Sequence, residues 1–247
     1  MTRYDVIGRT YTATRRTDPR IAARIHAALG DASTIVNVGA GTGNYEPEAR
    51  GVAAADPSRT MLAQRAPGTA PAVQAAAEAL PFGDWCFDAA LAVFTVHHWT
   101  DVDRGLRELR RVAPRQVILT FDGSAEQFWL VSDYLPVVSM LDAAGGLHTP
   151  AHISSVLDVV RVESVAVPAD CVDGFLACYW NRPEAYLDPL VQVGISGLAR
   201  LDPETRERGI AALRDDLASG AWDARHGDLR RRRALDVGYR LVVAGLP

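Results

Sequence analysis

Three glycines at alternate positions follow an apolar run and form the most informative stretch of the sequence. The run Ile35 to Val38 is typical of a strand buried on both faces of a parallel sheet, and Gly39, Gly41 and Gly43 follow directly. Because glycine has no Cβ, the backbone there can turn sharply and approach a ligand closely. The helix expected next would present free N–H groups to that ligand. The stretch therefore predicts the cofactor loop of a nucleotide-binding α/β fold.

An acidic residue ends the second expected strand, 51–55. The Asp56 carboxylate could accept hydrogen bonds from two ribose hydroxyls, and the alternative is that Asp56 simply caps a helix. The nicotinamide fingerprint needs G-x-G-x-x-G, and here the third glycine comes one residue early, at Gly43. An NAD-dependent oxidoreductase therefore stays as a weaker alternative.

Two histidines follow the fourth expected strand, 87–94. The carboxyl ends of parallel strands are where ligands bind in such sheets, so His97 and His98 lie where a substrate is expected. An imidazole titrates near neutral pH and could take a proton from a substrate. His97 is the candidate catalytic base and a candidate substrate-binding residue. The alternative is a histidine that only orders the loop, which we favour for His98.

Strands alternating with amphipathic helices over residues 20–122 predict a βαβ-wound parallel sheet and define the cofactor-binding half. Asp18 and Pro19 should begin its first helix, and Ser58 should cap the helix after the second strand. Thr100 should cap a later helix with Asp103 in a capping box. The rest is less regular, with a helix expected over 125–141 and strands over 160–167 and 238–244. We predict a single domain, 1–247, in which residues 124–236 form helical insertions that act as a substrate lid.

The composition excludes several classes of protein. All 26 basic residues are arginine, so lysine Schiff-base chemistry and a P-loop are excluded. The net charge of −4 argues against nucleic acid as a partner, and no apolar stretch is long enough for a membrane span. Three cysteines without a CxxC argue against a zinc site or a disulfide framework. A cytoplasmic location is expected because the N-terminus lacks an apolar signal.

The motifs, taken together, resemble the class I S-adenosylmethionine-dependent methyltransferases. Residues 36–43 resemble motif I, and residues 55–58 with Met61 resemble the second motif. The segments 77–82, 87–88, 97–99 and 108–112 continue the pattern in order, so the resemblance covers about residues 4–122. Residues 77–82 and 87–88 resemble the third and fourth motifs of the branch containing ubiquinone-type and trans-aconitate-type enzymes. It implies a Rossmann-like, doubly wound, seven-stranded and mostly parallel sheet with strand order 3-2-1-4-5-7-6.

The resemblance also implies a cofactor site for S-adenosyl-L-methionine. In this family the glycine loop passes under the methionine part, and the acid after the second strand holds the ribose. The segment after the third strand, which is expected over 72–75, borders the adenine. The implied residues are Asn37, Gly39, Ala40, Gly41, Gly43, Asp56, Pro57, Met61, Ala77, Glu78 and Val93. Asn37 stands where the family usually has an acid, so its contact to the methionine amine is expected to be weaker or made through water.

Related enzymes fold an N-terminal helix over the cofactor, which brings Tyr11 and Arg16 to the site. An arginine there would pair with the methionine carboxylate, and Arg15 is the rival for that contact. The alternative for these residues is a solvated surface helix. The expected product is S-adenosylhomocysteine.

A polar and aromatic cluster in the second half could wall the pocket of a small-molecule acceptor. The spacing of Asp170, Cys171, Asp173 and Cys178 suits one helical face. Asp170, Tyr179 and Trp180 are candidate substrate-binding residues, although aromatics of this kind are more often core. The predicted function is methyl transfer to an O, N or C nucleophile. The alternative is a non-methylating or non-catalytic protein that binds the same cofactor. The oligomeric state is not indicated.

Overall fold

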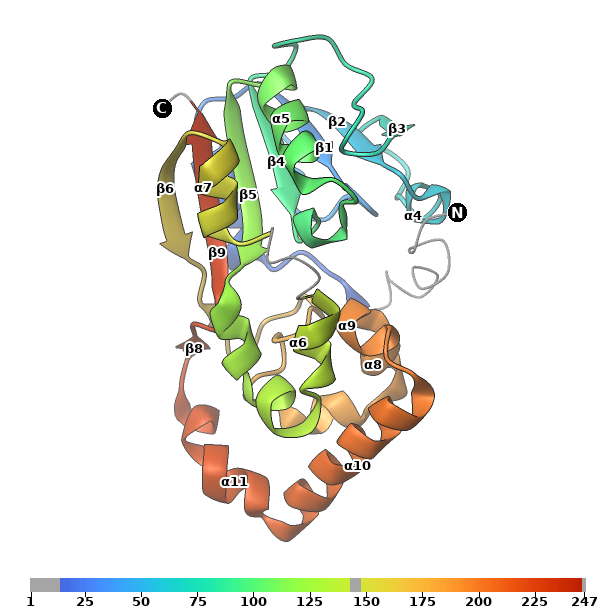
Figure 1. Cartoon of the computed structure of the whole chain (residues 1–247), viewed down its shortest axis with the longest axis vertical. Coiled ribbons are helices and arrows are strands. Elements are labelled where there is room, and N and C mark those ends of the chain that lie inside the picture. The colour runs from blue at the N-terminus through green and yellow to red at the C-terminus, as the bar shows by residue number, and fades with distance from the viewer. Residues whose placement is uncertain (1–13, 143–147, 246–247) are drawn as a thin grey trace.

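A seven-stranded sheet forms the upper half of the molecule, and a group of helices lies beyond the carboxyl ends of its central strands (Figure 1). The computed structural model describes residues 14–142 and 148–245. The order across the sheet is β3-β2-β1-β4-β5-β9-β6. Neighbouring strands from β3 to β5 are parallel, and β9 is antiparallel to both β5 and β6. Since β9 is the seventh strand of this sheet along the chain, the predicted order 3-2-1-4-5-7-6 is confirmed.

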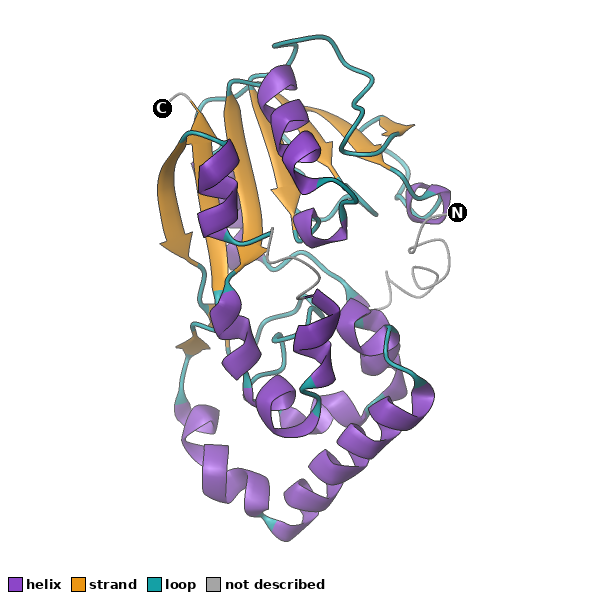
Figure 2. Ribbon diagram, viewed as in Figure 1, coloured by secondary structure: helices purple, strands orange, loops and turns teal. Residues whose placement is uncertain are grey.

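Figure 2 shows the helices in purple and the strands in orange, and their bounds are as follows. The strands are β1 Thr34–Val38, β2 Gly51–Asp56, β3 Ala72–Gln74, β4 Ala89–Val93, β5 Arg115–Phe121, β6 Val159–Ser164, β7 Val167–Pro168, β8 Ala234–Leu235 and β9 Tyr239–Gly245. The helices are α3 Pro19–Ala28, α4 Arg59–Leu62, α5 Val102–Val112, α6 Val137–Asp142, α7 Pro150–Val156, α8 Pro189–Gly194, α9 Ser196–Ala199, α10 Pro203–Ser219 and α11 Ala221–His226. Short β7 and β8 pair with each other outside the main sheet.

Different helices cover the two faces of the sheet. Alternating side chains of the central strands pack against one set of helices or the other. Ile35 and Leu91 belong to the same hydrophobic cluster as the buried side of α3. Val36 and Ala90 belong to a second cluster, which contains the buried stripe of α5 and Ile153 of α7. Successive strand residues point to opposite faces, so helices cover both sides of the sheet.

Helix ends mostly follow the expected capping. Asp18 caps α3 by accepting from Arg20 N, with Pro19 in the first turn, and Ser58 caps α4 by accepting from Met61 N. The prediction for α5 was wrong by one residue, because Asp101 is the N-cap and its side chain accepts from Arg104 N. Thr100 lies just outside the helix.

Four other expectations are wrong in detail. Turns occupy residues 41–50, so no helix follows the glycine loop. The expected helix over 125–141 is broken into a 3₁₀ segment Gly123–Gln127, a π-helical turn Leu130–Tyr134 and α6. The expected strand over 160–167 is divided between β6 and β7, and residues 170–178 lack a helix.

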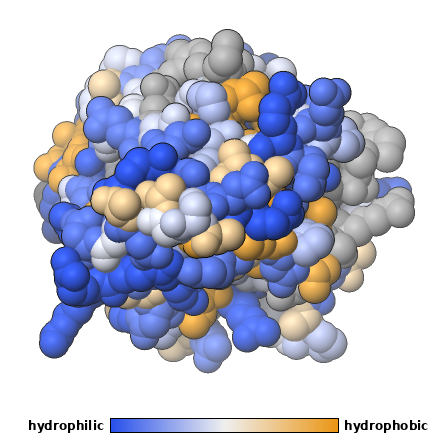
Figure 3. Space-filling view, turned by 90° about the horizontal axis from the view of Figure 1, so that it is seen from below, coloured by the Kyte–Doolittle hydropathy of each residue, from blue (hydrophilic) through white to orange (hydrophobic). Residues whose placement is uncertain are grey.

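An aromatic core holds the helical half together and continues into the sheet. Trp180, Trp222 and Tyr186 are fully buried, and they share one cluster with Ile35, from β1. The outer face of this half is predominantly hydrophilic, with smaller apolar areas between the hydrophilic residues (Figure 3). Among the described residues, no helix is both long and apolar enough to cross a bilayer.

Candidate functional site

The glycine loop after β1 has a backbone that only glycine adopts easily. Gly39, Gly41 and Gly43 all have positive φ angles, of 69°, 51° and 97°. A Cβ on Gly39 would lie 1.9 Å from Oγ1 of Thr95, and one on Gly41 would lie 3.1 Å from Cε of Met61. The sequence therefore requires glycine here both for conformation and for space. The loop forms a cradle of backbone at the carboxyl end of β1.

Asp56 fastens this loop to the end of β2. Its Oδ2 accepts a hydrogen bond of 2.8 Å from the N–H of Gly41, and its Oδ1 accepts one of 2.8 Å from the N–H of Ser58. The side chain is buried, with 7% of the residue exposed. A carboxylate offers about four acceptor positions, so these bonds are compatible with further donors. Asp56 thus shapes the site through the backbone as well as standing at its edge.

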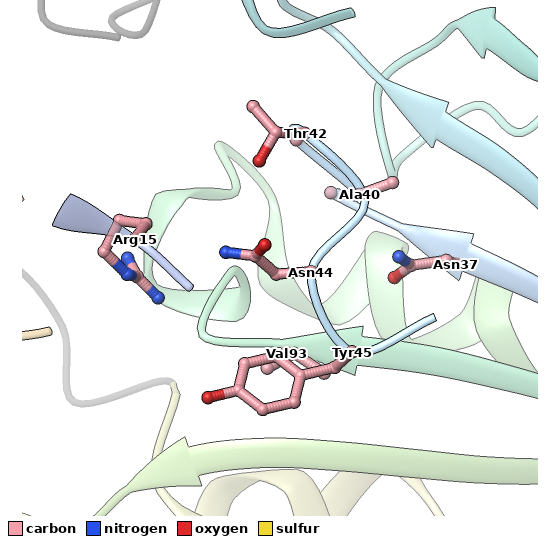
Figure 4. Close-up of a pocket in the computed structure, with 9 residues that line it drawn as sticks. Arg15, Asn37, Ala40, Thr42, Asn44, Tyr45 and Val93 are labelled. Carbon is pink, nitrogen blue, oxygen red and sulfur yellow. The ribbon is translucent and has the colours of Figure 1, made fainter. Parts of the chain in front are cut away.

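A cavity opens over the glycine loop, between β1, β4 and the segment that precedes α3 (Figure 4). It is lined by Arg15, Asn37, Gly39, Ala40, Gly41, Thr42, Asn44, Tyr45 and Val93. The buried Nδ2 of Asn44 has no hydrogen-bond partner among the described residues. Since a buried amide donor without a partner is costly, this atom indicates a ligand that accepts a hydrogen bond in the cavity.

Arg15, and not Arg16, reaches this cavity. Arg16 is exposed, whereas 10% of the Arg15 side chain is exposed and its guanidinium binds Asp173. Arg15 Nε and Nη2 donate to the two Asp173 oxygens at 2.5 and 3.2 Å. The hydroxyl of Tyr45 donates to Asp173 at 2.6 Å. This group of three residues joins the N-terminal segment, the glycine loop and the helical half, and sequence reasoning missed its connections because they are far apart in the chain.

Burial and the neighbouring carboxylate hold Tyr45 in its neutral form. Burial, followed by the charge of Asp173, raises the pKa of the Tyr45 phenol far above its ordinary value. Tyr45 also has a positive φ of 68°, and its N–H donates to Oγ1 of Thr17 at 3.1 Å. The hydroxyl is therefore a fixed donor to Asp173.

The other predicted cofactor residues surround the same edge of the sheet. Met61 is buried below Gly41, and Pro57 lies between Asp56 and the cap of α4. Ala77 is buried in the segment after β3. Glu78 Oε1 accepts from the N–H groups of Thr100 and Asp101 at 2.7 and 3.1 Å, which fixes that segment to the start of α5. Tyr11 lies outside the described residues.

His97 lies at the carboxyl edge of the sheet in a cluster of rings. It is half-buried in the 3₁₀ turn Val96–His98, and its ring centroid is 3.8 Å from that of His98. Phe121, at the end of β5, is 5.0 Å away, and His148 is 6.1 Å away. The structure thus places His97 at the expected edge and adds His148 to it, a residue that sequence reasoning missed.

The polar and aromatic cluster of the second half lies in turns and not on a helical face. Asp170 is on the surface, with 82% of its side chain exposed, and pairs with Arg20 at 2.6 Å. Trp180 is fully buried in the hydrophobic core and donates from its indole to the carbonyl of Val167. Tyr179 is half-buried beneath the guanidinium of Arg182, and burial raises the pKa of its phenol.

Comparisons with known proteins agree with this geometry. A family model described as a methyltransferase domain matches residues 36–121. A protein of Anabaena variabilis, described as a methyltransferase from an antibiotic biosynthesis pathway, has 30% identity and a TM-score of 0.82. The superposition covers 94% of this chain and 99% of that one. The chain belongs to the class I S-adenosylmethionine-dependent methyltransferases. S-adenosylmethionine is accordingly the cofactor of this methyltransferase, and methyl transfer is its reaction class.

Two more distant comparisons complete this result. A geranyl diphosphate C-methyltransferase of Streptomyces coelicolor A3(2), solved with S-adenosylhomocysteine, shares the fold of this methyltransferase at 14% identity and a TM-score of 0.51. That match covers 92% of this chain and 78% of the other. The uncharacterized protein YafE of Escherichia coli K12 is 46% identical over 39 residues, which are 16% of this chain and 19% of YafE.

The residues of the methyltransferase fit its cofactor. The glycine cradle leaves room that a Cβ would fill, and Asn44 provides a buried donor that lacks a partner among the described residues. Arg15 supplies a cation at the cavity and Asn37 supplies an amide. These groups suit the carboxylate and the ammonium of a methionine moiety.

Proposed function

We propose that this methyltransferase acts on a small-molecule acceptor and binds its cofactor in the cavity over the glycine loop. The Nδ2 of Asn44, which has no partner among the described residues, is the observation that carries the proposal. It indicates an acceptor atom that arrives with a ligand. The ubiquinone-type and trans-aconitate-type branch stays a prediction.

The proposed cofactor contacts follow from the positions of the residues. The backbone from Gly39 to Gly43 passes under the methionine part, and Arg15 takes the carboxylate contact expected of Arg16. The Asp56 carboxylate accepts hydrogen bonds from the ribose hydroxyls. Ala77 and Glu78 border the adenine through their backbone, because the Glu78 carboxylate is used to fix the start of α5. Ala40, Pro57, Met61 and Val93 complete the walls.

The protein mainly aligns the two reactants and excludes water from them. Bound S-adenosylmethionine supplies a methyl group on a positively charged sulfur, which is intrinsically reactive. A ring nitrogen of His97 is the proposed base for the proton that an O–H or N–H acceptor loses. The half-buried ring of His97, beside Phe121 and His148, is consistent with this role.

The helical half is proposed as the lid that selects the acceptor. Its position beyond the carboxyl ends of β1, β4 and β5 supports this role (Figure 1). The hydrophobic cluster shared by both halves supports a single domain over 1–247, with residues 124–236 as the lid. The cytoplasmic location suggested by the sequence stays a prediction.

Titration of the purified protein with S-adenosylhomocysteine and with NADH tests the cofactor site. We expect micromolar affinity for the first ligand only, and Asp56→Ala should weaken it clearly. The reverse preference would refute the proposed site. Asp31→Ala, which changes an exposed aspartate in the turn before β1, at the opposite end of the strands, is the matched control and should leave the affinity unchanged.

Transfer of a labelled methyl group into a pool of small metabolites tests the acceptor class. Label should appear in one or few metabolites and not in protein or nucleic acid. Tight binding of S-adenosylhomocysteine without any transfer would favour a non-methylating protein. Turnover that survives His97→Ala would remove His97 as the base and leave alignment of the reactants as the source of catalysis.

A further inference from the structure

A buried ion pair lies directly under the glycine loop and has no role in the contacts proposed above. Arg65 Nη1 and Nη2 donate to the two oxygens of Glu46 at 3.0 and 2.8 Å. Only 5% of the Arg65 side chain and 10% of the Glu46 side chain are exposed. Asn37, at the end of β1, donates from Nδ2 to Glu46 Oε1 at 3.0 Å. Glu46 therefore receives hydrogen bonds from an arginine and from a residue that lines the cavity.

The bond to Glu46 fixes which way the Asn37 amide points. An ionised carboxylate only accepts hydrogen bonds, so the amide nitrogen of Asn37 must face Glu46. In a planar carboxamide the oxygen then faces away from Glu46. Asn37 lines the cavity beside Asn44 and Tyr45 (Figure 4). The side chain can thus present an acceptor to a cationic donor in the cavity.

The ion pair is built into the loop on its other side as well. Arg65 donates to the carbonyl of Ala70 at 3.1 Å and makes a longer contact of 3.4 Å with the carbonyl of Gly41. A Cβ on Gly43 would lie 3.2 Å from both Arg65 Nη1 and Glu46 Oε2. Gly43 is therefore the residue that allows the loop to pack closely on this pair.

An aspartate in place of Asn37 would not fit this arrangement. Its carboxylate would stand about 3 Å from the Glu46 carboxylate. Keeping both carboxylates ionised at that separation is energetically unfavourable. We propose that Glu46, held by Arg65, is a positioning residue that orients the Asn37 oxygen toward the ammonium group of the cofactor. Glu46 thus supplies the acidic group that the family usually has at motif I. Its carboxylate in turn requires an asparagine, and not a second acid, at the end of β1.

This inference rests on the proposed cofactor site, and exchange of the two side-chain groups tests it. Asn37→Asp places two carboxylates together and should weaken binding of S-adenosylhomocysteine by about tenfold or more. The double variant, Asn37→Asp with Glu46→Gln, keeps the total charge. Its new glutamine can donate from the amide nitrogen to the new aspartate while the amide oxygen accepts from Arg65. Affinity should therefore return to within about threefold of the wild type.

Calorimetric titration with 5′-methylthioadenosine provides the control, because this ligand has the nucleoside but lacks the amino-acid part. Its affinity should be the same for the wild type and Asn37→Asp. Equal weakening for both ligands would show general damage to the loop, and no weakening for either would show that Asn37 has no such role; each result refutes the proposal. Failure of the double variant to recover also refutes it. A wild type that binds neither ligand would instead refute the proposed cofactor site.

Discussion

Removal of the Asp173 carboxylate should destabilise the protein strongly. Asp173 is fully buried and accepts hydrogen bonds from the Arg15 guanidinium and the Tyr45 hydroxyl. Asp173→Ala removes the carboxylate that faces a guanidinium with only 10% side-chain exposure. Removing one member of a buried pair costs about 3–5 kcal/mol. Each kcal/mol lowers the melting temperature of a protein of this size by about 2–4 °C, so we expect a decrease of roughly 6–20 °C.

Thermal unfolding followed by circular dichroism, without cofactor, measures this change. The matched control is Asp170→Ala, which removes a carboxylate three residues away with 82% side-chain exposure. An exposed ion pair contributes little, so the control should change the melting temperature by less than about 2 °C. A melting temperature for Asp173→Ala within about 2 °C of the wild type, or equal decreases in both variants, would refute the argument that burial decides the outcome.

Three other predictions follow from separate features. Gly39→Ala forces a Cβ to 1.9 Å from Thr95 Oγ1 at a φ of 69°, and should cost about 2 kcal/mol or more in urea unfolding; Gly83→Ala, with open space around it, should be close to neutral. Burial raises the pKa of Asp18, but hydrogen bonds from the Arg20 side chain and from backbone N–H groups outweigh it and lower the pKa to about 2. Its stabilisation is complete above the unfolded pKa near 4 and is lost as pH falls toward 2, so Asp18→Asn should flatten the fall of melting temperature over that interval; an equally steep fall would contradict it. Hydrogen bonding to Cys171 and burial raise the pKa of Cys178, and Cys171 is also buried. Native protein should therefore titrate one thiol with a disulfide reagent, the exposed Cys86, and unfolded protein three; a second fast thiol in the native state would disprove this.

Local sequence signals predicted the cofactor half of the fold well. The apolar runs of β1 and β4, the glycines of the loop and the caps Asp18 and Ser58 each act within a few residues, so their meaning is visible in the sequence. Thr100 and Asp101 show the limit of such signals, since both can cap α5 and only the side chain of Asp101 reaches an N–H of the helix.

Contacts between distant residues could not be predicted in the same way. Arg15 and Arg16 have the same chemistry, and the pairing with Asp173, 158 residues later, decides which one turns to the cavity. Residues 170–178 have spacing compatible with a helix, yet they lie in turns in which the buried Asp173 bonds to Arg15 and Tyr45, far away in the chain. The hydrogen bond between Asn37 and Glu46 spans only nine residues. The position of Glu46, however, depends on Arg65, which follows β2 in the chain.

The position of β9 has a consequence for how the protein is made. β9 lies between β5 and β6, so β6 reaches the rest of the sheet only through a strand that follows the whole helical half in the chain. During synthesis β6 leaves the ribosome long before its partner and has an unpaired edge until residues 239–245 emerge. Pairings so distant in sequence form slowly, and unpaired strand edges favour aggregation in the interval. Insertion of β9 is thus the late step that couples completion of the sheet to closure of the helical half.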